Sequence, residues 1–144
     1  MIVLDTRVVS EIMRAKPDPT VLGWLDTQQP DDLWLNSVAA AELRCGVARL
    51  LQGLRKQQLT LAVSAMLEQD FAGQILNFDL SAATVYAVVV AERERIGISM
   101  AMADAYIAAI CPSRNARGAT RNTKHFVGLG PALINPWESQ LSQV

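Results

Sequence analysis

The sequence predicts an α/β fold, a three-layer α/β/α sandwich with a central, mostly parallel sheet of four to five strands. Short apolar runs at 2–4, 33–35 and 75–78 are typical of strands that are buried on both faces. Longer segments between these runs carry apolar residues at helical spacing. Because strands and helices alternate along the chain, we expect a parallel sheet covered by helices on both faces.

The first half of the chain contains a strand, two short helices, a second strand and two longer helices. Helical spacing of apolar residues predicts the helices over about 8–13, 20–27, 37–54 and 55–68. Pro17 ends the first of them, because a proline ring clashes with the preceding helical turn. Ser37 is placed to cap the third, whose apolar stripe extends to Leu54.

The second half repeats this alternation. It contains a strand at 75–78, helices over about 81–95 and 99–110, and a further strand near 116–120. Ser81 is placed to cap the first of these helices, and Gly97 ends it at the usual glycine position. Pro112 ends the second. The last strand is expected although Arg117 and Gly118 have low strand propensity.

Length and composition limit the class of protein. The 144 residues fit a single domain spanning 1–144, long enough to bury a core without disulfides. Hydrophobic residues make up 51% of the chain and the mean hydropathy is +0.19, which suggests apolar surface for a second copy or another protein. The net charge of −1 gives no global positive field, so any binding to nucleic acid must be local.

The sequence predicts a cytoplasmic protein without membrane contact. The N-terminus lacks the features of a signal peptide, because Asp5 interrupts its first apolar run. The longest strongly apolar stretch, 82–91, is far shorter than the roughly 20 residues that a membrane span needs. Cys45 and Cys111 have no metal-ligand spacing and suit a reducing compartment.

Three acids stand in apolar surroundings. Asp5 follows the first strand, and in an open α/β sheet ligands bind at the carboxyl ends of the strands. Glu42 follows the apolar segment 38–41, and Asp104 lies within an alanine- and methionine-rich helix. A buried carboxylate must be paired, hydrogen-bonded, protonated or bound to metal, because an uncompensated buried charge is costly.

If Asp5, Glu42 and Asp104 converge, their mutual repulsion favours a cation among them. Oxygen-only ligands select Mg²⁺ or Mn²⁺, whose usual work is on phosphate esters. Such an ion polarises a phosphoryl oxygen and lowers the pKa of a bound water, so no histidine or serine nucleophile is needed. His125 is the only histidine, which excludes a zinc site built on several imidazoles.

Each acid also has a structural interpretation. In this interpretation, Asp5 is a helix cap, Glu42 is a solvated surface acid, and Asp104 is an acid that is paired with another side chain. A phosphoacceptor receiver or a dehalogenase-like phosphatase with Asp5 as nucleophile is a weaker alternative, since the phosphatase needs a second aspartate where Arg7 stands. The sequence contains no Gly-rich phosphate loop, Gly-x-Ser-x-Gly elbow or Cys-x-x-Cys pair, which excludes P-loop enzymes, serine hydrolases and thiol redox proteins.

Five motifs, in order and at plausible spacing, resemble the PIN-domain ribonucleases of the VapC toxin type. They lie at 4–11 (Leu-Asp-Thr-Arg-Val-Val-Ser-Glu), 41–46 (Ala-Glu-Leu-Arg-Cys-Gly), 103–109 (Ala-Asp-Ala-Tyr-Ile-Ala-Ala), 119–126 and 134–137 (Ile-Asn-Pro-Trp). The resemblance spans nearly the whole chain. It implies a PIN-like α/β/α sandwich in which Asp5, Glu42 and Asp104 match the three main acidic positions.

The resemblance also implies an activity and partners. The expected activity is Mg²⁺-dependent cleavage of RNA by an endoribonuclease toxin, with Mn²⁺ as a possible substitute ion. The expected partners are a cognate antitoxin, which inserts an apolar helix and often a basic side chain into the toxin, and a second copy in a homodimer. DNA would be bound only indirectly, through the antitoxin.

Several positions depart from the family pattern. Arg7 stands where the family usually has asparagine, either to hold a substrate phosphate or to pair with Asp5 and displace the ion. Asn122 falls near the fourth acidic position, and His125 replaces a common aspartate; we expect His125 to lie on a surface loop more readily than to bind metal. The segment 111–118 differs from the family's continuing helix, turn and apolar strand.

These departures support an alternative, a catalytically degenerate PIN domain that acts as an antitoxin-binding module. Under the preferred interpretation, basic residues beside the acidic motifs hold the RNA phosphates. The candidates for substrate binding are Arg7, Arg44, Arg121 and Asn122, with Lys124 nearby and Arg44 as first choice. The alternative for each basic residue is that it pairs with one of the acids or faces solvent and does not bind RNA.

Overall fold

The computed structural model describes residues 1–138. Five strands form one sheet in the order β3-β2-β1-β4-β5, and every neighbouring pair is parallel. The strands are β1 (Ile2–Leu4), β2 (Leu33–Asn36), β3 (Ile75–Leu76), β4 (Arg117–Ala119) and β5 (Ala132–Ile134). In the centre of the sheet, Val3 pairs with Trp34 on one side and with Gly118 on the other. The predicted parallel sheet is therefore confirmed.

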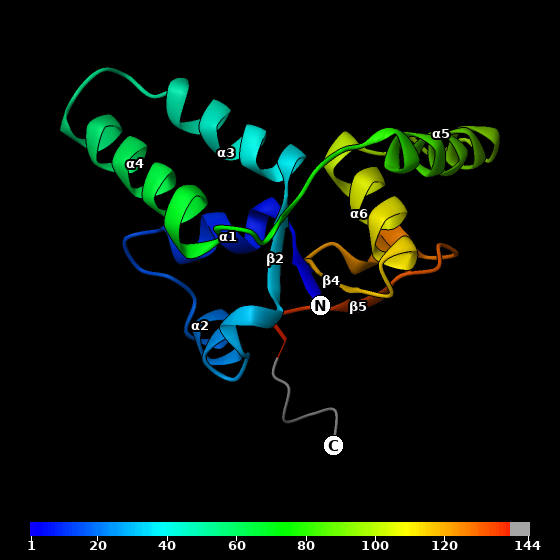
Figure 1. The fold of residues 1–144 in the computed structure, drawn as a ribbon, viewed down its shortest axis with the longest axis horizontal. Helices are drawn as coiled ribbons and strands as arrows, with labels where there is room; N and C mark the ends of the chain where they lie inside the picture. The colour runs from blue at the N-terminus through cyan, green and yellow to red at the C-terminus, as the bar shows by residue number, and fades with distance from the viewer. Residues whose placement is uncertain (139–144) are drawn as a thin grey trace.

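Six helices connect these strands (Figure 1). They are α1 (Thr6–Ile12), α2 (Pro19–Asp26), α3 (Ser37–Ala48), α4 (Leu54–Ala65), α5 (Leu80–Arg95) and α6 (Met102–Ser113). Three shorter helical turns are η1 (Pro30–Asp32), η2 (Met66–Asp70), which continues α4 with π-helical geometry, and η3 (Thr123–Phe126). The pairs α3–α4 and α5–α6 spread apart beyond the upper end of β2 in Figure 1, whereas α2 lies at the opposite end.

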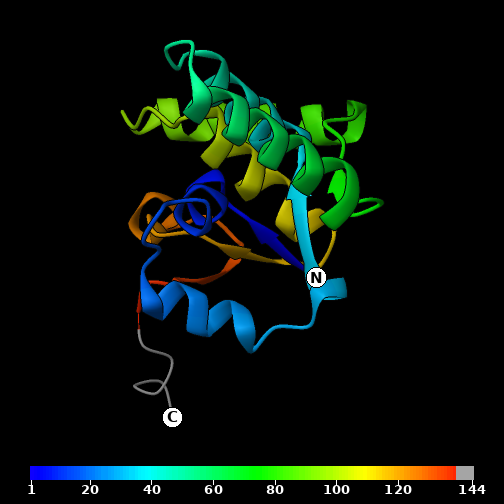
Figure 2. The same ribbon diagram turned by 90° about the vertical axis from the view of Figure 1, so that its left-hand side faces the viewer.

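The core lies on both faces of the sheet, as the predicted sandwich requires. Ile2 and Leu4 belong to a buried cluster formed with α1, α2, α3 and α4, whereas Val3 belongs to a second cluster formed mainly by α6. This alternation follows from the pleat of a strand, which directs successive side chains to opposite faces. Figure 2 shows the sheet between α2 on one side and the longer helices on the other.

Two predicted helix caps are wrong by one or two residues. The side chain of Asn36, not that of Ser37, accepts a hydrogen bond from a backbone N–H of the first turn of α3, at 2.8 Å. Asp79, not Ser81, does the same for α5, also at 2.8 Å. In both cases the residue with extended backbone immediately before the helix takes the cap, because an N-cap has non-helical dihedral angles.

Some element ends also differ from the prediction. Helix α3 ends at Ala48, so Leu54 begins the next helix instead of completing an apolar stripe. Strand β3 has only two residues, Ile75 and Leu76. Gly97 follows α5 with a φ of 80°, a conformation that glycine adopts without steric cost, so the predicted end of that helix is confirmed.

The segment 111–118 forms a helix end, a turn and a strand, although its residues differ from the family pattern for these elements. Helix α6 runs through Pro112 to Ser113, so the prediction that Pro112 ends this helix is wrong; the helix ends one residue later and loses one backbone hydrogen bond at the proline. Asn115 then turns the chain with a φ of 52°. A Cβ atom on Gly118 would lie 3.1 Å from methyl carbons of Ile107 and Leu133, so glycine lets β4 approach α6 closely.

Within residues 1–138, no helix is both long enough and apolar enough to cross a membrane.

Candidate functional site

Two of the three predicted acids come together at the carboxyl end of the sheet. Asp5 directly follows β1, and its backbone N–H donates to the carbonyl of Ala119 in β4 at 2.9 Å. Asp104 lies in the first turn of α6. The two residues are only 1% and 2% exposed, so their carboxylates need partners inside the protein.

Three side chains supply these partners. Thr120 Oγ1 donates to Asp5 Oδ2 at 2.9 Å, and His125 Nδ1 lies 3.2 Å from Asp104 Oδ2. Arg7 joins the two acids, because its Nη1 lies 3.1 Å from Asp5 Oδ2 and 3.5 Å from Asp104 Oδ1. One guanidinium therefore faces two buried carboxylates.

Asn122 completes the group. With its amide oxygen turned toward Arg7, it accepts from Nη1 at 2.7 Å and from Nη2 at 3.2 Å. Its backbone N–H donates to Thr120 Oγ1 at 3.2 Å, which links it to the hydroxyl that holds Asp5. Asp104 Oδ1 has no hydrogen-bond partner among residues 1–138, although it is buried.

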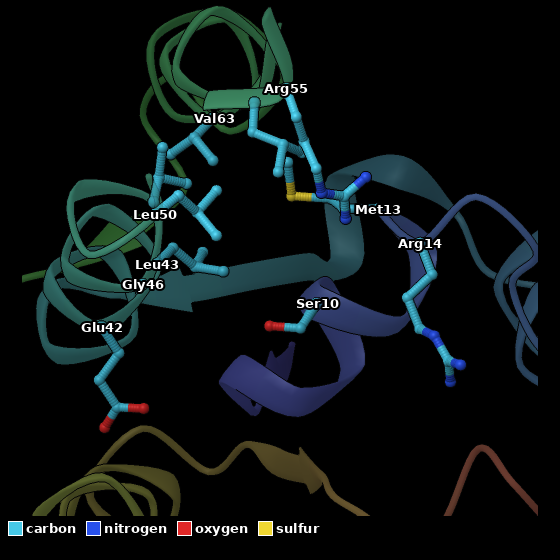
Figure 3. Close-up of a pocket in the computed structure, with 11 residues that line it drawn as sticks. Ser10, Met13, Arg14, Glu42, Leu43, Gly46, Leu50, Arg55 and Val63 are labelled. Atoms are coloured by element: carbon cyan, nitrogen blue, oxygen red, sulfur yellow. The ribbon is translucent and has the colours of Figure 1, made fainter. Parts of the chain in front are cut away.

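Glu42 occupies a different environment. It is exposed on α3, and no hydrogen bond or ion pair joins its carboxylate to another side chain in the described part of the chain. Figure 3 shows it at one end of a groove between α1, α3 and α4, opposite the apolar end near Leu50 and Val63. The side chain points toward α6, against which α3 packs and which carries Asp104.

The donor chemistry of this site fits a hard divalent cation, but the space is taken. Two buried carboxylates, one with an oxygen that accepts no hydrogen bond from residues 1–138, are the ligands that Mg²⁺ or Mn²⁺ prefers. The guanidinium of Arg7 lies within 3.5 Å of one oxygen of each acid. Over residues 1–138, no three His, Cys, Asp or Glu side chains form a group able to hold a metal ion. The convergence of Glu42 with the two aspartates therefore stays a prediction.

The other predicted phosphate-binding residues lie farther out. Arg44 extends from α3 toward the end of α4, where its guanidinium lies 3.5 Å from Glu68 Oε1 and donates to Ser64 Oγ at 3.3 Å. The guanidinium carbon of Arg121 lies 5.2 Å from the centre of the Trp137 ring. All of these contacts are at the surface, so a role in binding phosphate stays a prediction for both arginines.

Helix α6 is held firmly beneath the site. The hydroxyl of Tyr106 donates to the carbonyl of Asn77 at 2.8 Å, and burial, with a smaller contribution from Asp79, raises its pKa to about 12. Burial also raises the pKa of the Cys111 thiol to about 12, which keeps this thiol neutral and unreactive. The position of Asp104 thus depends on a well-packed helix.

Sequence reasoning missed the roles of two residues. Thr120 directly follows β4, so the same strand-end argument that selects Asp5 also selects it, because neighbouring parallel strands end at one edge. His125 was expected on a surface loop, and it lies in η3 with a half-exposed side chain, but it contacts Asp104 as well. Only the tertiary structure reveals that contact.

Comparisons with known proteins identify the family. The family model described as PIN domain matches residues 2–127. The VapC ribonuclease Y4jK of Sinorhizobium fredii is 40% identical over 138 residues, covering 96% of this chain and 99% of that protein. Toxin FitB of Neisseria gonorrhoeae is 40% identical over 137 residues, covering 95% and 99%.

A solved structure of FitAB bound to an IR36 DNA fragment superposes with a TM-score of 0.89 and 38% identity, covering 97% of this chain and 98% of that one. The match in sequence and the match in fold both extend over nearly the full length, and they confirm the resemblance found in the five motifs. The chain therefore belongs to the PIN domain family.

Proposed function

We propose that this protein is a metal-dependent endoribonuclease toxin of a toxin–antitoxin module. The observation that carries the proposal is the pair of buried carboxylates, Asp5 and Asp104, which share one cation at the carboxyl end of a parallel sheet. Relatives named VapC ribonuclease and toxin FitB, each about as long as this chain, support the reaction class.

In this proposal, Asp5, Asp104 and Glu42 hold Mg²⁺ or Mn²⁺. The ion supplies Lewis-acid activation of the scissile phosphodiester. Thr120 fixes the orientation of the Asp5 carboxylate through its hydroxyl. His125 does the same for Asp104. Glu42 is exposed on α3, so its side chain is the least constrained of the three proposed ligands.

Basic and amide side chains around the acids hold the RNA backbone. Arg7 is the best placed, because its side chain is 47% exposed and its guanidinium is already at the site. Asn122 lies beside it, and Arg44 and Arg121 are further candidates at the surface. These local charges are needed because the chain as a whole has a net charge of −1.

The direct test is RNA cleavage by Asp5→Asn and Asp104→Asn. Each variant loses one negative charge at nearly constant shape, so we expect cleavage in Mg²⁺ to fall by roughly 100-fold or more while circular dichroism shows an intact fold. Glu92→Gln is the matched control, since Glu92 is exposed and pairs with Arg95 on α5. Unchanged cleavage by both aspartate variants contradicts the proposal.

The proposed partners are an antitoxin and a second copy of the chain, in the cytoplasm. The groove between α1, α3 and α4 combines apolar residues with Arg14, Glu42 and Arg55, which suits an amphipathic helix of an antitoxin. The related FitAB complex was solved on DNA, and we propose that this chain reaches DNA only through its antitoxin. Exposed apolar side chains offer surface for the homodimer; they include Leu80, Val88, Ile96, Ile98 and Met102.

One observation favours a second candidate function, a catalytically silent module that binds the antitoxin. The guanidinium of Arg7 contacts both aspartates that would hold the ion, and Asn122 brings an amide instead of a fourth acid. A silent module cleaves no RNA at any concentration of Mg²⁺ or Mn²⁺ and still binds its antitoxin. Cleavage assays across a metal titration therefore separate the two candidates.

A further inference from the structure

Arg7 is unusual because it is a mobile cation inside a site of fixed anions. It lies in the first turn of α1, two residues after Asp5, and its side chain is 47% exposed. Its two carboxylate partners are almost completely buried; Asp5 directly follows β1, and Asp104 belongs to α6. The arginine can therefore leave by a change of rotamer, whereas the acids cannot.

The contacts around the two acids leave one carboxylate oxygen poorly compensated. His125 Nδ1 contacts Asp104 Oδ2 at 3.2 Å, but Oδ1 of the same carboxylate lies 3.5 Å from the guanidinium of Arg7, which is too long for a hydrogen bond of good geometry. That oxygen has no hydrogen-bond partner within residues 1–138. Arg7 thus compensates the negative charge incompletely, and a divalent cation would compensate it better.

Arg7 and a metal ion cannot occupy the site together. Its Nη1 lies 3.1 and 3.5 Å from one oxygen of each acid, in the space that an ion bound to those oxygens would fill. Mg²⁺ binds carboxylate oxygens at about 2.0–2.1 Å, and a guanidinium a few ångströms away would repel it. One cation must leave before the other enters.

We propose that Arg7 is a resident counter-cation, and that a divalent metal must displace it from Asp5 and Asp104 in order to bind. This inference rests on the proposed function, in which those acids are metal ligands. It adds that the chain's own arginine sets the affinity for metal. The displaced guanidinium is then free to contact a phosphate of the RNA.

The test measures Mn²⁺ binding to the metal-free full-length protein by calorimetry. Arg7→Asn and Arg7→Gln remove the competing cation and keep both carboxylates. We expect each variant to bind Mn²⁺ at least about tenfold more tightly than the wild type, because binding no longer breaks an ion pair. Adding Asp104→Asn to Arg7→Asn should abolish the gain.

Arg95→Gln is the matched control. Arg95 also pairs with a carboxylate, since its Nη2 lies 2.9 Å from Glu92 Oε2 on α5. Its removal breaks an arginine–carboxylate pair that does not involve Asp5 or Asp104. We expect its Mn²⁺ affinity to equal that of the wild type.

Thermal unfolding gives a second readout that does not depend on catalysis. In buffer with a chelator, Arg7→Asn should melt below the wild type, because two buried carboxylates then lack a cation. Saturating Mn²⁺ should raise its melting temperature by more than that of the wild type. A variant that is simply damaged would lose stability without this recovery.

The outcomes separate the inference from the function on which it rests. Equal Mn²⁺ affinity in the wild type and both Arg7 variants overturns the competition, and the proposed nuclease stands if the wild type cleaves RNA in Mg²⁺. No Mn²⁺ binding by any variant also overturns the competition. If the wild type then fails to cleave RNA at any metal concentration, the proposed function fails too.

Discussion

Helices α3 and α6 each bring an acid to the proposed site, but they are packed differently. Helix α6 is buried without interruption from Asp104 to Cys111, whereas α3 buries only Ala39 and Leu43. Accordingly, Asp104 is buried and contacts Arg7 and His125, whereas Glu42 is exposed on α3. The acid in the buried helix is positioned before any ligand arrives, and the acid in the exposed helix is not.

The two cysteines provide the largest expected contrast between these helices. Cys45 is exposed on α3, whereas Cys111 is buried on α6 with a pKa raised to about 12. A thiol must ionise and be reached in order to react, so we expect a disulfide reagent to label Cys45 roughly 100-fold faster or more in the native protein. Cys45→Ala isolates the slow site. Equal labelling rates would show that α6 opens readily.

Neutralising Asp104 should change the stability of the protein more than neutralising Glu42. Asp104→Asn removes an incompletely compensated buried charge, so in chelator we expect it to raise the free energy of unfolding by about 1 kcal/mol. Glu42→Gln alters an exposed side chain and should change it by less than about 0.5 kcal/mol. Urea denaturation measures both. A marked loss of stability in Asp104→Asn would mean that its charge is well compensated.

Glycine-to-alanine substitutions compare how tightly the surroundings of the two helices are packed. In Gly118→Ala, the new methyl group would lie 3.1 Å from carbons of Ile107 on α6 and Leu133 on β5, so we expect a loss of about 1 kcal/mol. In Gly46→Ala on α3, nothing lies within 4 Å, and helix propensity should add about 0.5–1 kcal/mol. Melting temperatures that shift in the same direction would contradict this comparison.

Alkaline pH should lower the stability of the folded protein, and this effect should be smallest near neutral pH. Burial raises the pKa of Cys111 from 9.0 and that of Tyr106 from 10.0, each to about 12 in the folded chain. Both groups are neutral when protonated, so the unfolded chain loses its protons first, and stability should fall as pH rises from about 9 to about 12. Tyr106→Phe should reduce this slope above pH 10 in unfolding titrations.

Much of the fold could be predicted because its signals are local. Apolar runs mark β1 and β2, and helical spacing marks the helices that follow them. The helix caps at Asn36 and Asp79 were missed, because several neighbouring polar residues are equally able to cap and only the backbone dihedral angles distinguish them. The helix, turn and strand of 111–118 follow from packing against Ile107 and β1, not from propensity.

The candidate site could be predicted in part. Asp5 was found from its place at a strand end, and Asp104 from its apolar surroundings. The contact between His125 and Asp104 joins residues on two separate elements, and no local pattern encodes it. For Arg7, the sequence left two roles open, and the structure places its guanidinium on Asp5.

By itself the sequence determined the alternation of strands and helices, the family and the identity of the candidate acids, because these depend on the order and chemistry of residues along the chain. Tertiary structure decided which groups meet. Asp5 and Thr120 are 115 positions apart, and their 2.9 Å hydrogen bond exists only because β1 and β4 are neighbours in the sheet. Ion pairs depend on distances of a few ångströms, and only the packed fold sets distances on that scale.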